Sequence, residues 1–236
     1  MSFRAVITFH SIDEARGPLS YPPQRLDALL SALDHAGLSV VDLDSLLVSP
    51  AKPGVSLTFD DGMRSVFSAA LPVLRDHGAR AHLFLATGSV ADGATHPGAF
   101  EMLDWNELGE LHRAGVAIES HTHSHRDCRT LSDAEIDHEC ASADALIERR
   151  IGRRPRYFAY PFGRHDARVC ERVGRRYAAA FTTVLGPLPA ELDRARLPRL
   201  DAHYLRSPRI YERLDAATTR AYLEIRRMLR VVRGTD

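Results

Sequence analysis

The chain has 236 residues, 44% of them hydrophobic, and this length suits one large α/β domain as well as two small ones. We expect a single domain over residues 1–236. Thirty-one Lys and Arg residues balance 31 Asp and Glu residues, so net charge gives no reason to expect nucleic acid as a partner. Cys128, Cys140 and Cys170 are far apart and form no CxxC motif, which indicates neither a disulfide framework nor a thiolate zinc site.

The amino-terminal stretch MSFRAVITFHSID passes directly into a strand-like run and lacks the apolar region of a signal peptide. No later run approaches the roughly 18 apolar residues that a membrane-spanning helix requires. We therefore expect a cytoplasmic protein without a transmembrane segment, in a reducing compartment.

Short apolar runs rich in β-branched residues recur along the chain and predict strands. They are RAVITF (4–9), LSVVDL (38–43), GVSLTF (54–59), RAHLFLA (80–86), GVAIES (115–120), RYFAYP (156–161), AAAFTT (178–183) and ARLPRLD (195–201). Most are separated by stretches with helical spacing. The clearest helical stretches cover 23–37, 64–78, 105–115 and 132–152, and each finishes on a glycine.

This alternation of strand, helix and glycine predicts an α/β fold with a mainly parallel sheet, and seven or eight such units can close into a barrel. The loop at 86–104 is the longest irregular segment, and we expect it on the surface near a site.

Two motifs follow predicted strands, where parallel α/β folds place their chemistry. LTFDDG (57–62) carries the adjacent Asp60 and Asp61, and ESHTHSH (119–125) carries His121 and His125 four residues apart. One acid and two histidines can bind a metal ion. A second acid beside that ion would take a proton from the attacking water, as a metal-assisted hydrolase requires.

TFDDG, HTHSH and FAYPFG (158–163), in this order, resemble the signature segments of the polysaccharide deacetylases, carbohydrate esterase family 4 with its NodB-homology domain. The resemblance extends from about residue 9 to residue 201. It implies a distorted (β/α) barrel of about seven mainly parallel strands. It also implies a divalent metal, zinc in the first place with cobalt, nickel or iron as alternatives, and removal of N-acetyl groups from a hexosamine in a polysaccharide or its precursor.

Residue by residue, the resemblance makes Asp61, His121 and His125 the metal ligands and Asp60 the catalytic base. The backbone N–H of Phe162 matches the family's oxyanion donor. A late histidine, His203 in RLDAHY, stands where the family has its general acid, although the local match is poor. If His203 does not act, Asp60 or a bound water could return the proton.

One position departs from the family pattern. Ala159 stands where many members have an arginine that orients the catalytic aspartate. Another group must then hold Asp60, and Arg156, Arg164 and His10 are the candidates.

Other interpretations remain open. Adjacent aspartates before glycine most often form a solvated turn, and only the paired histidines change that interpretation. The same barrel could hydrolyse a non-sugar amide, or the protein could bind carbohydrate with little catalysis. Two histidines and one carboxylate also resemble the facial triad of a ferrous oxygenase, but the βα alternation and the second acid argue against it.

The carboxyl-terminal segment at about 218–233 is predicted to be a basic amphipathic helix. Tyr222, Ile225, Leu229 and Val232 lie along one side, and five arginines accompany them. A helix packed on the barrel is the favoured interpretation, and the alternative is peripheral contact with a membrane surface or a lipid-linked sugar.

Overall fold

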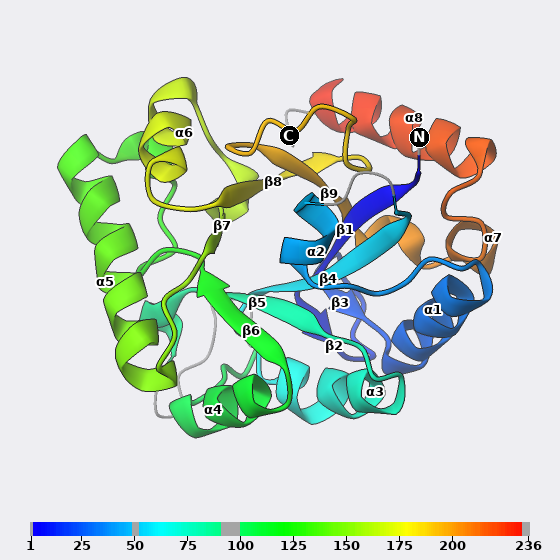
Figure 1. Cartoon of the computed structure of the whole chain (residues 1–236), viewed down its shortest axis with the longest axis horizontal. Coiled ribbons are helices and arrows are strands. Elements are labelled where there is room, and N and C mark those ends of the chain that lie inside the picture. Colours follow the sequence, from blue (N-terminus) through cyan, green and yellow to red (C-terminus); the bar gives the residue numbers. More distant parts are fainter. Residues whose placement is uncertain (1, 49–51, 91–99, 233–236) are drawn as a thin grey trace.

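The computed structural model describes residues 2–48, 52–90 and 100–232. Seven parallel strands close into a barrel in the order β1-β4-β5-β6-β7-β8-β9, with β9 pairing back to β1 (Figure 1). The strands are β1 Arg4–Phe9, β4 Gly54–Asp61, β5 Ala81–Leu85, β6 Val116–Ser120, β7 Tyr157–Ala159, β8 Ala179–Leu185 and β9 Leu197–Asp201. The predicted distorted (β/α) barrel is confirmed.

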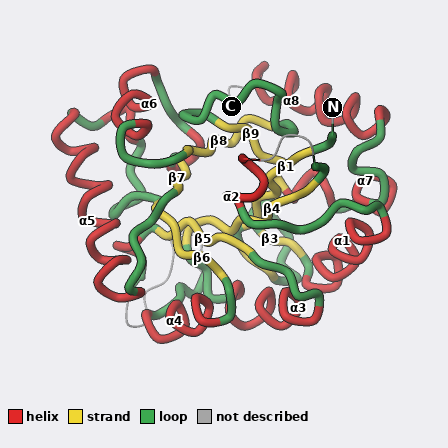
Figure 2. The backbone as a smooth tube through the Cα atoms, in the orientation of Figure 1, coloured by secondary structure: helices red, strands yellow, loops and turns green. Residues whose placement is uncertain are grey.

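Helices surround the barrel (Figure 2), so both faces of most strands are buried, and the strands are mainly apolar in sequence. The outer helices are α1 Pro23–His35, α3 Leu71–Asp76, α4 Trp105–Arg113, α5 Asp133–Ile151, α6 Ala167–Gly174, α7 Pro208–Tyr211 and α8 Ala217–Val232. A π-helical turn, η1 Val66–Ala70, leads into α3. Two short strands, β2 Ser11–Ile12 and β3 Ser20–Tyr21, pair with each other beside the barrel. The described residues also form four 3₁₀ turns, which are η2 Thr87–Ser89, η3 Cys128–Thr130, η4 Pro161–Gly163 and η5 Ala202–Leu205.

The predicted glycine endings of the helices are present. Gly37, Gly78, Gly115 and Gly152 follow α1, α3, α4 and α5, and all have positive φ, between 59° and 98°. Only glycine adopts this left-handed conformation without steric cost, so each helix ends there and the chain turns back toward the next strand.

The predicted strand at 38–43 is wrong. Val40 makes a single isolated bridge to Val55, and the chain then enters a short helix, α2 Leu43–Val48. Leu43, Leu46 and Leu47 are buried against barrel side chains, and Arg4, at the start of β1, donates a 3.1 Å hydrogen bond to the carbonyl oxygen of Leu46. α2 therefore covers the amino-terminal opening of the barrel (Figure 1), because burying its three leucines there is worth more than extending the sheet.

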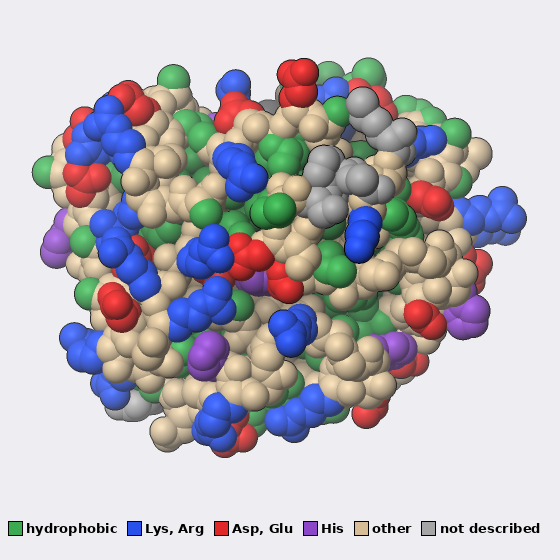
Figure 3. Space-filling view, in the orientation of Figure 1, with side chains coloured by type: hydrophobic (Ala, Val, Ile, Leu, Met, Phe, Trp, Pro, Cys, Tyr) green, Lys and Arg blue, Asp and Glu red, His purple; other side chains and the backbone are tan. Residues whose placement is uncertain are grey.

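The long loop predicted at 86–104 is only partly described. η2 begins it, and residues 91–99 lie outside the described residues. On the face of the molecule that carries α2, charged side chains of both signs are interspersed (Figure 3), in line with the balanced composition.

Candidate active site

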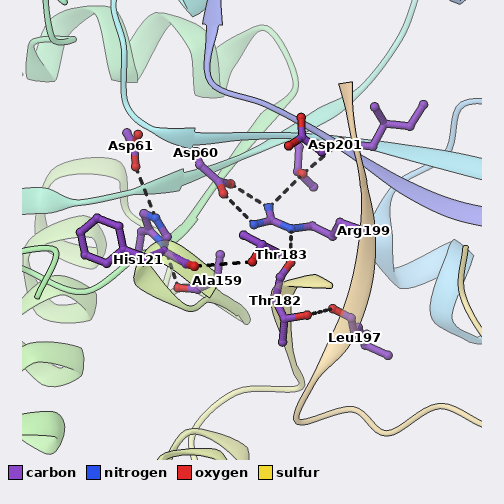
Figure 4. Close-up of polar contacts among 12 residues, drawn as sticks. Asp60, Asp61, His121, Ala159, Thr182, Thr183, Leu197, Arg199 and Asp201 are labelled. Carbon is purple, nitrogen blue, oxygen red and sulfur yellow. Dashed lines mark hydrogen bonds and ion pairs between the residues drawn. The ribbon is translucent and has the colours of Figure 1, made fainter. Parts of the chain in front are cut away.

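The carboxyl ends of the parallel strands bring together residues that are far apart in sequence. Asp60 and Asp61 are the last two residues of β4, and His121 directly follows β6. Phe162 lies in η4, after β7, and β9 contributes Arg199. Figure 4 shows Asp60, Asp61, His121 and Arg199 converging at this end of the barrel.

Asp61, His121 and His125 form a compact group of three potential metal ligands. The Nε2 atoms of His121 and His125 are 3.2 Å apart, and they lie 3.4 and 3.3 Å from Asp61 Oδ1. Ligand atoms about 2.1 Å from a zinc ion lie about 3.0 to 3.4 Å from one another in octahedral or tetrahedral sites. The spacing therefore fits one ion bound by all three side chains.

The orientation of the His121 ring also fits metal binding. Its Nδ1–H donates to the carbonyl oxygen of Ala159 at 2.7 Å, which leaves the Nε2 lone pair directed at the group. Burial lowers the pKa of the His125 ring and so favours its neutral form, which is the form that can bind a metal ion. The pKa of Asp61 lies well below its usual range, because hydrogen bonds to His121 and His125 outweigh the effect of burial.

The loop that carries the two histidines is held by α5. Glu139 accepts hydrogen bonds from the backbone N–H groups of His123 and Ser124, at 3.0 and 2.7 Å, and from the Ser124 hydroxyl at 2.7 Å. Thr122 Oγ1 accepts from the His125 N–H at 3.0 Å. These bonds fix the loop and the position of His125.

Backbone strain is concentrated at this site. Among the described residues, four non-glycine residues have positive φ: Asp61 (73°), Thr122 (67°), His125 (54°) and Phe162 (58°). Each such conformation costs on the order of 1–2 kcal/mol. All four lie in the segments that contain the predicted ligands and oxyanion donor, where strained backbone is retained when function requires it.

Asp60 is outside the ligand group and is held by Arg199. Arg199 Nη1 and Nη2 donate to the two Asp60 carboxylate oxygens at 2.8 and 2.6 Å (Figure 4). The side chains are only 1% and 4% exposed. The remaining Arg199 donors bond the Thr182 carbonyl oxygen at 3.0 Å and Thr58 Oγ1 at 3.3 Å. This two-pronged contact fixes both the position and the rotation of the carboxylate.

Electrostatics keep Asp60 ionised. Burial acts to raise its pKa, but the charge and hydrogen bonds of Arg199, together with the charges of His121 and His10, bring the pKa below its ordinary value. His10 directly follows β1, and its charge also lowers the pKa of Asp61.

Arg199 takes the role for which the sequence suggests Arg156, Arg164 or His10. Arg156 pairs instead with Asp44 at 2.6 Å, and Arg164 with Asp127 at 3.3 Å. The available signal was an arginine inside the apolar run LPRLD, because a charge in a buried strand requires a partner. The sequence around Arg199 does not indicate which acidic residue on another strand is its partner.

Phe162 presents both its backbone and its ring to the site. Among described residues, no hydrogen-bond acceptor is found for its N–H, so that group is available to a ligand. Phe162 is 55% exposed as a residue, and the centroid of its ring lies 4.6 Å from that of His125. Gly163, with φ of 68°, completes the turn against Thr183.

His203 lies in η5, after β9. Burial lowers the pKa of its ring, and its Nδ1 is buried without a hydrogen-bond partner among the described residues. Its ring contacts Tyr204 edge to face, with centroids 5.3 Å apart. Its role as the general acid stays a prediction.

The family assignment rests on a sequence comparison. The model for the family described as polysaccharide deacetylase matches residues 48–178, which is more than half of the chain. The chain belongs to the polysaccharide deacetylase family. The matched segment contains the two aspartates, the two histidines and Phe162. Arg199 and His203 lie beyond it.

Individual relatives agree with this assignment. YxkH of Bacillus subtilis (strain 168), named as a candidate polysaccharide deacetylase, is 27% identical over 190 residues, 77% of this chain and 64% of its own length. The chain thus spans less than two thirds of that relative. Two solved structures share the fold. The Streptococcus pyogenes deacetylase PplD in complex with acetate has a TM-score of 0.74 at 23% identity and covers 84% of this chain and 92% of its own. IcaB from Ammonifex degensii has a TM-score of 0.77 at 20% identity and covers 93% and 98%.

Proposed function

We propose that this deacetylase is a metal-dependent hydrolase that removes N-acetyl groups from an N-acetylhexosamine in a polysaccharide or its precursor. The observation that carries the proposal is the division of labour between two neighbouring carboxylates. Asp61 points into the ligand group with His121 and His125, while Asp60 is turned away and held by Arg199. One acid can therefore hold the metal while the other moves a proton.

A divalent ion held by Asp61, His121 and His125 would supply Lewis acidity to the amide carbonyl and to the attacking water. The mixed oxygen and nitrogen donors suit zinc, and they also suit cobalt, nickel or iron.

Asp60 would act as the general base. Its depressed pKa keeps the carboxylate ionised at neutral pH and ready to accept a proton. The contact with Arg199 keeps this carboxylate from rotating into the ligand group. Two oxygens with about four acceptor positions leave room for a water molecule as well as the guanidinium.

The oxyanion formed by attack on the amide would accept a hydrogen bond from the Phe162 N–H. The positive φ of Phe162 sets the direction of that N–H, and the hydrogen bonds from Gly163 N–H to the Tyr160 carbonyl oxygen (2.8 Å) and from Arg164 N–H to the Pro161 carbonyl oxygen (3.1 Å) hold the turn. A donor fixed before the reaction stabilises developing charge at no cost of reorganisation.

The departing amine requires a proton, and two histidines compete for this role. His203 is the residue that the family resemblance suggests. His10, which directly follows β1 at the same end of the barrel, is the second candidate. Loss of the alkaline limb of the pH–rate profile in His10→Gln or in His203→Gln identifies the acid.

The test is acetate release by the zinc- or cobalt-loaded protein from N-acetylglucosamine oligomers and from nucleotide- or lipid-linked N-acetyl sugars. Asp60→Asn is the control, with metal content measured in both proteins. We expect release that requires metal and is lost in the variant, which should still bind the ion. Metal binding without release from any sugar would refute the proposal and favour a non-sugar amide substrate or a carbohydrate-binding role.

A further inference from the structure

A cavity of about 570 Å³ lies at the end of the barrel opposite the candidate active site. Its walls are the last turns of α3 and α4 and the residues that lead into β5 and β6. These parallel strands begin at the cavity, whereas Asp61 ends β4 and His121 follows β6. A ligand bound in the cavity would therefore not compete with one at the candidate active site.

The cavity carries positive charge that the fold does not balance. Arg75, Arg80, Arg113 and Arg153 line it and define a basic cavity, and none of the described residues in its lining is acidic. Among the described residues, no ion pair or side-chain hydrogen bond engages any of these four guanidinium groups. The charge of Arg80 lowers the pKa of Asp42, but the two side chains form no ion pair. In Figure 3, Lys and Arg side chains stand along the lower edge, where α3 and α4 lie in Figure 1.

A second arginine-rich cavity, between α5 and α6, shows how this fold neutralises such a group. It is also lined by four arginines, and each of them pairs with a carboxylate. The pairs are Arg154 and Arg176 with Asp144, Arg172 with Asp137, and Arg175 with Glu171. The basic cavity has the same number of arginines and no such partners, so a shortage of acids sets it apart.

Helix ends offset only part of the charge of the basic cavity. Arg75 and Arg113 lie in the last turns of α3 and α4, and Arg153 follows the end of α5. The carboxyl end of a helix carries a partial charge of roughly −0.5. Three such ends offset about −1.5 of the four positive charges, which leaves a positive charge of roughly 2 to 3. Like charges around one cavity repel one another, and a bound anion would remove that repulsion.

We propose that the basic cavity binds a ligand that carries a diphosphate group. Guanidinium groups suit this ligand because their forked donors bond two phosphate oxygens at once. One phosphate group carries a charge of about −1.5 to −2, and a diphosphate carries roughly −3, which is closer to the charge that the helix ends leave. The cavity volume lies within the range of small-molecule sites, about 300–1,000 Å³, so there is room for the rest of the ligand.

Two sources share this chemistry, a soluble nucleoside diphosphate and the headgroup of a lipid diphosphate. No helix in the described parts of the chain is long and apolar enough to cross a bilayer, and the cavity itself does not distinguish the two sources. Separate arms of the experiment therefore use uridine diphosphate and phosphatidylcholine vesicles that carry farnesyl diphosphate. The proposal does not rest on deacetylase activity, because the cavity and the candidate active site lie at opposite ends of the barrel.

The experiment is isothermal titration calorimetry of the full chain at low salt with inorganic phosphate, pyrophosphate and uridine diphosphate. The protein is first treated with a chelator, so that no metal ion in the candidate active site binds the diphosphate. We expect one site that binds pyrophosphate about tenfold or more tightly than phosphate, with an affinity that falls as salt is raised. Arg80→Gln/Arg113→Gln should weaken this binding about tenfold or more, because two charge-assisted contacts are lost.

Arg172→Gln/Arg175→Gln is the matched control. It removes the same charge from the cavity between α5 and α6, where acids already pair with both arginines, and should leave the affinity unchanged. Thermal unfolding checks that both double variants retain the wild-type fold. Absence of pyrophosphate binding, equal affinities for phosphate and pyrophosphate, or an equal loss in the two double variants overturns the proposal. Tighter binding of uridine diphosphate than of pyrophosphate supports it with a nucleotide as the ligand. Binding to the farnesyl diphosphate vesicles that Arg80→Gln/Arg113→Gln abolishes supports it with a lipid headgroup.

Discussion

The buried pair of Asp60 and Arg199 makes the sharpest prediction, the effect of Arg199→Met. The substitution keeps a long side chain but removes two charge-assisted hydrogen bonds, at 2.8 and 2.6 Å, from a carboxylate that is only 4% exposed. Such bonds contribute about 1.5–3 kcal/mol each, and breaking a buried ion pair by removing one partner costs about 3–5 kcal/mol. We therefore expect the free energy of unfolding at neutral pH to fall by about 3–5 kcal/mol.

The same change predicts a pH dependence, measured in metal-free protein. In the wild type the pKa of Asp60 is lowered on folding, so its stabilising contribution is present above the unfolded pKa and is lost as pH falls through the folded pKa. Without Arg199, burial dominates and raises the folded pKa. The variant is then destabilised as pH rises above the unfolded pKa. The gap between the two proteins should be largest at neutral pH, should narrow as pH falls, and should close only below the lowered folded pKa of Asp60 in the wild type.

Activity gives an independent readout. A raised Asp60 pKa moves the acid limb of the pH–rate profile to higher pH, which a purely structural role of Arg199 would not do. Arg172→Met is the control, because Arg172 makes comparable contacts to Asp133 and Asp137 on the surface and should cost less than about 1 kcal/mol.

A double-mutant cycle completes the test by denaturant unfolding. Arg199→Met/Asp60→Asn should recover much of the lost stability, because no buried charge is left alone. Additive effects of the two substitutions, or an unmoved acid limb in Arg199→Met, would refute this reading of Arg199.

Three further outcomes are expected. Asp60→Asn should lower kcat about 10²–10⁴-fold at unchanged metal content, since it removes the base but no ligand; a parallel loss of metal by elemental analysis would contradict that role. His125→Ala should lower metal content and stability to a chelator-treated level, whereas retention of a full equivalent of metal would show that this residue is not a ligand. Gly163→Ala should lower the free energy of unfolding by about 1–3 kcal/mol, because its φ is 68° and the added Cβ would overlap the Thr183 side chain. Thr183→Ala in the same chain should recover only part of the steric cost, because the Cβ of residue 183 would still lie 2.6 Å from the added Cβ; full recovery would show that φ carries no cost.

The sequence predicts most of the barrel because its signals are local. Apolar runs, helical spacing and a glycine after each helix are fixed by residues a few positions apart, and they agree with the observed strands and helices. The exception is 38–43, where a short apolar run is ambiguous between strand and helix, and the barrel opening that α2 fills is not encoded nearby. The group of Asp61, His121 and His125 was also predictable, because Asp61 ends one strand of the parallel sheet and the two histidines follow another.

Arg199 shows why the rest of the site was not accessible. A closed barrel brings every strand end to the same rim, so the group that orients Asp60 can come from any strand whose side chain points inward. Ala159, at the end of β7, offers its carbonyl oxygen to His121, and Arg199 reaches Asp60 from β9. In this chain, the backbone of β7 therefore orients His121 and a side chain of β9 orients Asp60. An arginine at position 159 would place the group that orients the aspartate on β7. The chemistry demands a buried cation beside the base, but it does not specify the strand that provides it.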